Sequence, residues 1–204
     1  MNRLIWHLRR LVHGAPVIVV SGLPRSGTSM LMQMLDAGGL ALLTDAKRTA
    51  DEDNPQGYFE LEQVRHLPCD DGRWLRDARG KAVKVVSTLL RYLPDRNNYK
   101  VILMRRDLSE VLASQARMLT RRGQVHDTDQ VRMRRLFEDD LWRAIYLIKH
   151  ASHFDYLEVD YTQVIEDPKA QAVRIADFVA ARLNIDNMAG VVDSALYRNR
   201  CRPG

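Results

Sequence analysis

The sequence predicts an α/β fold in which a central parallel sheet of four to five strands lies between two layers of helices. Four short runs are almost continuously apolar and rich in β-branched residues, and segments with helical patterns separate them. Parallel strands have this composition because helices bury both faces of the sheet. The runs are Val17–Val20, Ala82–Val86, Val101–Met104 and Tyr156–Val159, with Leu40–Leu43 as the candidate for a fifth strand.

The first helices are predicted from the residues that begin and end them. Met30–Leu35 follows a glycine turn after the first strand, and a Gly-Gly pair ends that helix. Asp107 is an acidic N-cap with Glu110 at the third helical position, the arrangement of a capping box. We therefore expect a helix over Leu108–Arg121.

Two later helices are predicted in the same way. An apolar stripe at helical spacing indicates the first: Phe137, Leu141, Ala144, Ile145 and Ile148. Asp167 followed by Pro168 is an N-cap with proline at the first helical position, which indicates the second. Gly123–Asp129 is polar and breaks the helical pattern, so we expect a mobile loop there.

The length of 204 residues is enough for one domain with a substantial core. We expect a single domain over 1–204, with a basic N-terminal segment at 1–14 and a C-terminal tail at 190–204. Hydrophobic residues make up 46% and charged residues 28%, as in soluble globular proteins. Cys69 and Cys201 form no metal or disulfide framework, which favours a reducing compartment and a cytoplasmic location.

The N-terminal segment is basic and only partly apolar. His7 and two arginines interrupt its apolar run, so neither a signal peptide nor a transmembrane segment is expected. The pattern favours a short amphipathic helix that packs on the domain, with an anionic surface as the alternative.

The net charge of +5 is compatible with a nucleic acid or with a small polyanion as partner. Basic residues cluster between Arg117 and Arg135, but aromatic residues do not alternate with them. A cofactor with several negative charges also needs a basic site, so the charge does not decide between these partners; no specific nucleic acid is expected.

The stretch Ser21–Ser29 is the most informative part of the chain. The strand Val17–Val20 enters a turn bounded by Gly22 and Gly27, and a helix follows at once. The N–H groups of such a turn and the positive end of the helix dipole point at one place, which forms a phosphate cradle. We therefore predict a P-loop-type three-layer fold, with an ordinary polar turn as the alternative.

This loop departs from the nucleotide-hydrolase pattern G-x-x-x-x-G-K-[ST] at one position. Thr28 occupies the lysine position, and the cation is Arg25 inside the loop. The loop is expected to bind an anion without the lysine that reaches β- and γ-phosphates.

The run Pro24-Arg25-Ser26-Gly27-Thr28-Ser29 resembles the 5′-phosphosulfate loop of sulfotransferases that use 3′-phosphoadenosine-5′-phosphosulfate (PAPS). Arginine in place of lysine at position 25 is similar to the carbohydrate, tyrosyl-protein and bacterial members. The resemblance implies that all six residues bind PAPS, that Arg25 also takes part in catalysis, and that no metal is needed.

A second motif follows the third strand. Arg106 comes at the strand end, and Ser114 lies eight residues later on the next helix. This spacing resembles the 3′-phosphate motif of the same family, although Leu108 replaces the usual proline. A guanidinium binds a phosphate monoester through charge-assisted hydrogen bonds. The alternative is that Arg106 pairs with a surface carboxylate and Ser114 bonds within its own helix.

Tyr156–Tyr161 resembles the family's strand that leads into a Tyr-Glu-Asp-Leu segment. The resemblance implies that Tyr161 lies against adenine, although Gln163 and Val164 replace the aspartate and leucine. A packing residue at the end of a strand is the alternative for Tyr161.

Asn54–Glu60 is similar to the Asn-Pro-x-Gly-Tyr-x-Glu segment of many bacterial sulfotransferases. Sulfuryl transfer needs a base for the acceptor's proton, and related enzymes take a glutamate from this region, so Glu60 is the candidate base. A glutamate that only stabilises a helix start is the alternative. The competing bases are Asp51, Glu52, Asp53 and His66.

Lys84 interrupts the otherwise apolar run Ala82–Val86. A buried charge is costly unless it reaches a polar site. The family often has a lysine near this strand, which implies that Lys84 helps to neutralise the bridging oxygen of the donor. The alternative is a lysine whose head reaches solvent at the sheet edge.

The resemblance implies an enzyme that moves a sulfuryl group from PAPS to a hydroxyl or amine and releases 3′,5′-ADP. A small molecule, a carbohydrate, a lipid headgroup or a protein tyrosine is the expected acceptor. The glycine-rich C-terminal loop of phenol-type members is missing, and Arg198, Arg200 or Arg202 is the candidate replacement.

Two other functions stay open. One is a P-loop nucleoside or small-molecule kinase, for which Asp107 is the candidate magnesium ligand. The other is a non-catalytic nucleotide- or RNA-binding module, which would bind polyanions in a salt-sensitive way.

Overall fold

The central sheet of the computed structural model contains four strands, each parallel to its neighbours, in the order β2-β1-β3-β4. The structure describes residues 3–45, 57–121, 123 and 130–193. The strands are β1 (Val17–Gly22), β2 (Ala82–Lys84), β3 (Tyr99–Arg105) and β4 (Phe154–Asp160). Each of the four apolar runs singled out in the sequence therefore overlaps a strand, and the predicted α/β fold is confirmed.

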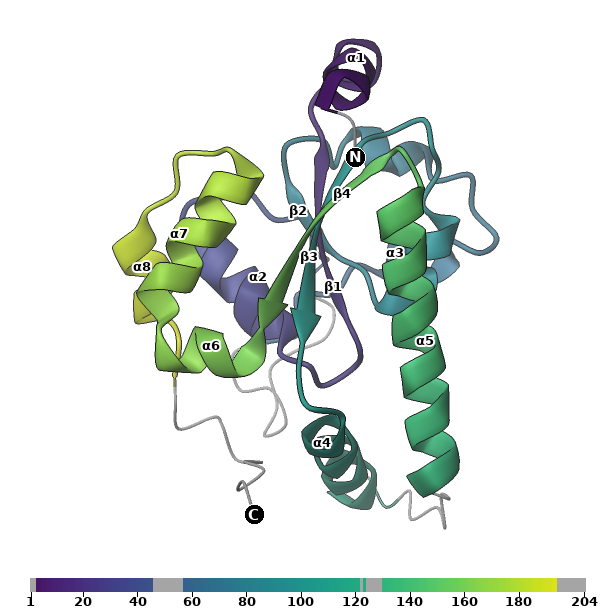
Figure 1. The fold of residues 1–204 in the computed structure, drawn as a ribbon, viewed down its shortest axis with the longest axis vertical. Coiled ribbons are helices and arrows are strands. Elements are labelled where there is room, and N and C mark those ends of the chain that lie inside the picture. Colours follow the sequence, from purple (N-terminus) through teal and green to yellow (C-terminus); the bar gives the residue numbers. More distant parts are fainter. Residues whose placement is uncertain (1–2, 46–56, 122, 124–129, 194–204) are drawn as a thin grey trace.

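Helices cover both faces of this sheet (Figure 1). One layer contains α2, α6, α7 and α8, and the other contains α3 and α5 with the 3-10 helices η1 and η2. The bounds are α1 (Arg3–His13), α2 (Thr28–Ala37), α3 (Glu62–His66), η1 (Arg73–Arg76), η2 (Ser87–Tyr92), α4 (Leu108–Arg121), α5 (Gln130–His150), α6 (Tyr161–Glu166), α7 (Pro168–Val179) and α8 (Ile185–Gly190).

The strand β1 contributes to both hydrophobic cores. Its side chains alternate between the faces, because successive Cβ atoms of a strand point in opposite directions. Val17 and Val19 belong to the core beneath α5, whereas Ile18 and Val20 belong to the core beneath α2. All four are buried. Burial on both sides explains the unbroken apolar run in the sequence.

Leu40–Leu43 does not form the fifth strand that was considered. It pairs with β2 at one isolated parallel bridge, between Leu42 and Ala82. The Leu40 N–H donates to the Leu35 carbonyl at the end of α2, at 2.9 Å, so this residue still closes the helix.

The predicted N-cap residues of α4 and α7 are confirmed. Asp107 Oδ1 accepts hydrogen bonds from the backbone N–H groups of Ser109, at 2.8 Å, and Glu110, at 3.3 Å. Asp167 Oδ1 accepts from the N–H of Ala170 at 3.0 Å, and α7 begins with proline. These bonds satisfy N–H groups that have no acceptor within the helix.

The order of the strands places a topological switch between β1 and β3. The segment after β1 leads to α2 on one face, and the segment after β3 leads through α4 to α5 on the other. Figure 1 shows α4 beyond the carboxyl end of β3. In open parallel sheets, ligands bind outside the carboxyl ends of the strands at such a switch.

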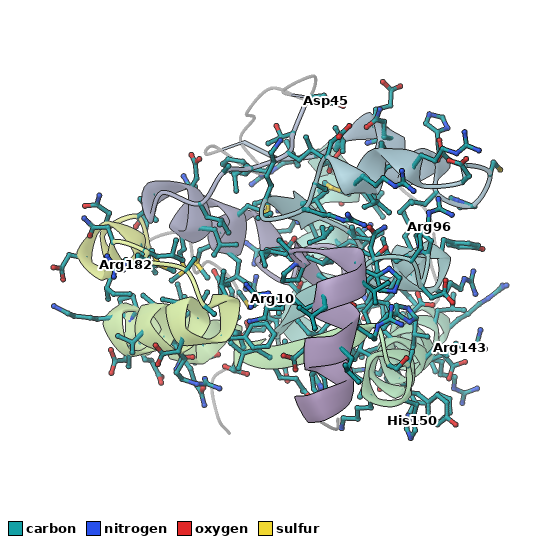
Figure 2. All side chains as sticks on the ribbon, turned by 90° about the horizontal axis from the view of Figure 1, so that it is seen from above. Arg10, Asp45, Arg96, Arg143, His150 and Arg182 are labelled. Carbon is teal, nitrogen blue, oxygen red and sulfur yellow. The ribbon has the colours of Figure 1, made fainter. Side chains whose placement is uncertain are left out.

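The helix α1 lies at the opposite end of the sheet (Figure 1). Figure 2 views this end, with Arg10 of α1 and Arg96 labelled. Arg9 Nε donates to Asn98 Oδ1 at 3.0 Å, and Arg9 Nη2 donates to the carbonyls of Asn97, at 3.2 Å, and Asp95. The apolar residues of the described part of this helix are exposed: Leu8, Leu11 and Val12. Polar contacts of Arg9 therefore attach this part of α1 to the domain.

Candidate active site

The loop between β1 and α2 has the backbone geometry of an anion cradle. Gly27 precedes the helix with φ 104°, and Arg25 has φ 68°. The first intrahelical hydrogen bond runs from the Leu31 N–H to the Gly27 carbonyl at 3.3 Å. The N–H groups of Thr28–Met30 therefore lie in the first turn, where a helix offers them no acceptor. A negative charge is favoured at this position.

Ser26 closes the loop from inside. Its Oγ donates to the Leu23 carbonyl at 2.7 Å, and its N–H donates to the same oxygen at 3.2 Å. A Cβ at Gly22 would lie 2.6 Å from this hydroxyl, so the position requires glycine. Of the other predicted residues, Thr28 is buried and Pro24 is exposed.

The two predicted anion motifs are in direct contact. Arg25 Nε donates to Ser114 Oγ at 3.1 Å, and Arg106 Nη1 donates to the Arg25 carbonyl at 3.3 Å. Residues from the loop after β1 and from the segment after β3 therefore form one cluster. This places Ser114 in a contact outside its own helix.

Arg106 is buried and held by a carboxylate. Its Nε donates to Glu110 Oε2 at 2.9 Å, and only 7% and 4% of the two side chains are exposed. The guanidinium carbon lies 4.2 Å from the centroid of the Tyr161 ring, within the range of a cation–π interaction. A carboxylate partner was one of the two alternatives for Arg106, but the partner is buried and not on the surface.

Tyr161 contacts both motifs. Tyr161 is 5% exposed, and a Cβ added at Gly27 would lie 2.5 Å from Cδ2 of the tyrosine ring. The ring therefore packs against the Gly27 backbone as well as the Arg106 guanidinium. This supports a packing role for Tyr161, and the contact with adenine stays a prediction.

Lys84 faces the start of α2. Its Nζ donates to Ser29 Oγ at 3.0 Å and to the Tyr58 carbonyl at 2.8 Å. The side chain is part-buried, so these contacts differ from those expected of a lysine that only reaches solvent at the sheet edge. Lys84 joins β2, the first turn of α2 and the segment 57–60.

Glu60 comes two residues after Tyr58, at the edge of this cluster. Its Oε2 accepts a hydrogen bond from Nη2 of the exposed Arg65 at 2.9 Å, and its carbonyl accepts from the Asp45 N–H at 3.2 Å. Of the competing bases, His66 is exposed on α3. The rest lie outside the described residues, as do Asn54–Gln56, the three C-terminal arginines and most of Gly123–Asp129.

The charge of the cluster is positive. Arg25, Lys84 and Arg106 supply three cations, and the buried carboxylate of Glu110 pairs with Arg106. Within the described part of the chain, no group of three or more His, Cys, Asp or Glu residues is arranged to hold a metal ion. The arrangement suits a ligand with more than one anionic group.

The sequence did not predict the partner of Arg106. Glu110 was assigned to the cap of α4, and the structure adds the buried ion pair. The two residues are four positions apart, but Arg106 lies before α4, which begins at Leu108, so the i,i+4 rule for helices gave no signal for this pair. The packing of Tyr161 on Gly27 joins distant segments and had no local signal.

The comparison with known families matches residues 15–199 to the family described as "Sulfotransferase domain". The chain therefore belongs to the sulfotransferase domain family. A search among curated proteins finds no match. None of the described helices is long and apolar enough to cross a membrane.

Two solved structures resemble the chain in fold. The sulfotransferase domain from the Synechococcus PCC 7002 olefin synthase has a TM-score of 0.53 and 15% identity, and the match covers 92% of this chain and 81% of that one. The sulfotransferase domain from the curacin biosynthetic pathway has a TM-score of 0.53 and 12% identity, with 85% and 76% covered.

Proposed function

We propose that the protein transfers a sulfuryl group from PAPS to a hydroxyl or amine of an acceptor and releases 3′,5′-ADP. The observation that carries this proposal is the hydrogen bond of 3.1 Å between Arg25 and Ser114. It joins a loop suited to a 5′-phosphate group with a second cationic motif. A nucleotide that carries anions at both its 5′ and 3′ positions needs two such sites in one rigid frame.

The described residues fit such a donor. The first turn of α2 offers N–H groups to the 5′ end. Arg106 and Ser114 would bind the 3′-phosphate, since guanidinium and hydroxyl groups donate to phosphate oxygens. Tyr161 would lie near the adenine end.

When bound, PAPS supplies the sulfuryl group, and negative charge develops on the bridging oxygen as this group leaves. Lys84 would offset that charge, because its Nζ already lies 3.0 Å from the hydroxyl of Ser29 in the cradle. Arg25 would add a second cation to the same region. Cations fixed in place before the reaction stabilise developing charge at little reorganisation cost.

Glu60 would accept the acceptor's proton. The segment 57–60 is attached to Lys84 through the Tyr58 carbonyl, at 2.8 Å, which brings it close to the cradle. Arg65 Nη2 donates to the Glu60 carboxylate at 2.9 Å, which orients this side chain. The acceptor would be a small molecule, a carbohydrate or a lipid headgroup in the cytoplasm.

A thermal-shift panel tests the proposal. We expect 3′,5′-ADP to stabilise the protein without metal, by about 2.7 kcal/mol at a hundredfold excess over its Kd. ADP is expected to give a much smaller shift, because it lacks the 3′-phosphate. Equal shifts from the two nucleotides would overturn the proposal.

Two further samples distinguish the other functions. A shift with ATP and magnesium that exceeds the shift with 3′,5′-ADP would indicate a P-loop kinase. A salt-sensitive shift with a short RNA alone would indicate a nucleic-acid-binding module. Arg106→Ala should weaken binding of 3′,5′-ADP. Arg105→Ala is its matched control, because the adjacent Arg105 pairs with Glu158 at 3.0 Å, and both side chains are more than a third exposed.

A further inference from the structure

We infer that Glu110 is a positioning residue, which fixes the Arg106 guanidinium in the orientation that recognises a 3′-phosphate. The inference rests on the proposed function. Glu110 itself would not contact the nucleotide, because its carboxylate is an anion. Its effect would pass through Nε of Arg106, to which its Oε2 is bonded at 2.9 Å.

Arg106 is held by three different elements. Glu110 of α4 accepts a hydrogen bond from its Nε, and the Arg25 carbonyl of the loop accepts one from its Nη1 at 3.3 Å. The centroid of the Tyr161 ring lies 4.2 Å from its guanidinium carbon. A guanidinium is planar, and its donors have fixed directions. A bond at Nε, together with a tyrosine ring 4.2 Å from the guanidinium carbon, therefore restricts where the outer N–H groups point.

Burial separates this ion pair from an ordinary surface pair. The adjacent residue Arg105 forms an ion pair with Glu158, and these two side chains are 38% and 36% exposed. The side chains of Arg106 and Glu110 are only 7% and 4% exposed. Exposed pairs are screened by solvent and salt and hold their side chains loosely. A buried carboxylate is costly to desolvate, and it persists where it fixes a specific arrangement.

Glutamine, the neutral isostere of glutamate, separates the effect of where the Glu110 acceptor lies from the effect of its negative charge. The amide oxygen of Gln at position 110 can accept the same hydrogen bond from Nε without adding negative charge. A shorter aspartate keeps the charge but moves the acceptor away. Displacements of about 1 Å are enough to weaken an oriented contact strongly.

The test measures Kd by calorimetry for 3′,5′-ADP and for adenosine 5′-monophosphate, which differ only in the 3′-phosphate. The ratio of the two constants isolates recognition of that group. For Glu110→Ala and Glu110→Asp we expect the ratio to fall at least about tenfold, with adenosine 5′-monophosphate affinity changed less than about threefold. Glu110→Gln should keep the ratio within about threefold of the unmodified protein. Glu158→Ala is the control and should change neither constant.

The outcomes are distinct. If the unmodified protein shows no preference for 3′,5′-ADP, the proposed function fails. If it shows the preference and folded Glu110→Asp or Glu110→Ala retains it, only the role of Glu110 is overturned. A parallel loss of affinity for both nucleotides would also overturn it, because a general structural defect does not distinguish them. If Glu110→Ala does not fold, the ratio of the two Kd values in Glu110→Asp and Glu110→Gln tests the role of Glu110.

Discussion

Arg25 donates from Nε to the Ser114 hydroxyl at 3.1 Å, although the two residues are 89 positions apart in the chain. The contact is possible because β1 and β3 are adjacent parallel strands, so the segments that follow them begin at the same edge of the sheet. One hydrogen bond thereby connects the cradle after β1 with the helix after β3. Any ligand that binds both motifs depends on this connection.

Ser114→Ala is expected to weaken binding of 3′,5′-ADP about tenfold, because it removes a hydroxyl bonded to a charged donor. Isothermal titration calorimetry measures the change. Ser109→Ala is the control, since Ser109 is on the same helix but its Oγ accepts from Arg134 at the surface, at 2.8 Å. Equal effects of the two changes would contradict the assignment of Ser114.

Arg25→Ala is expected to lower turnover by about 10²–10³, because the substitution removes a cation from the place where the leaving group gains charge. The loss should appear mainly in kcat, measured with radiolabelled PAPS and a generic phenol or sugar acceptor. The same substitution at Arg105 is the control. A change confined to the KM for PAPS would assign Arg25 to binding alone.

The sequence was sufficient to predict the strands and the N-cap residues, because each depends on neighbouring residues. Burial of both faces of β1 leaves an unbroken apolar run, and Asp107 caps the N–H groups of Ser109 and Glu110, two and three residues later. The contact between Tyr161 and Gly27 depends on how α6 lies over the loop after β1. No periodicity records such a contact, so the sequence left two roles open for this tyrosine.

The contact of Gly27 with Tyr161 predicts that Gly27→Ala costs about 2–5 kcal/mol of unfolding free energy. The left-handed backbone accounts for about 1–2 kcal/mol of this, and the steric overlap with the ring for the rest. Gly39→Ala is the control, because Gly39 also has positive φ, 92°, but a Cβ there meets nothing within 4 Å. Urea unfolding should separate the two variants.

The same substitution in a Tyr161→Leu variant tests whether the tyrosine ring causes the loss of stability. Tyr161→Leu removes the ring edge, so Gly27→Ala should cost less there and approach the value for Gly39→Ala. An equal cost of Gly27→Ala in both backgrounds would show that the ring is not the source.

His153 predicts a pH dependence of stability. Burial lowers the pKa of His153 below its ordinary value of 6.5, and Arg9 lowers it further while Asp95 opposes the shift. The unfolded chain therefore takes up a proton at a pH where folded His153 is still neutral. The free energy of unfolding should decrease as the pH falls through the interval between 6.5 and the lower folded pKa.

His153→Phe removes this titration and keeps a ring beside Tyr99 and Phe154. We expect the variant to lose less stability than the unmodified protein between about pH 7.5 and 5, measured by urea unfolding. The same substitution at His66, which is exposed on α3, is the control. A difference of the same size in both variants would contradict a specific contribution from His153.

The last prediction concerns the base. Glu60→Gln keeps the size of the side chain and its ability to accept from Arg65, but it removes the proton acceptor. If Glu60 deprotonates the acceptor, sulfuryl transfer should fall by about 10²–10⁴ while the Kd for 3′,5′-ADP stays close to that of the unmodified protein. The binding measurement matters because it separates lost chemistry from a disturbed cradle. Glu62→Gln is the matched control, two residues further along at the start of α3. A Glu60→Gln enzyme with a near-normal rate would transfer the role to Asp51, Glu52, Asp53 or His66, and the same pair of measurements on those variants would identify the base.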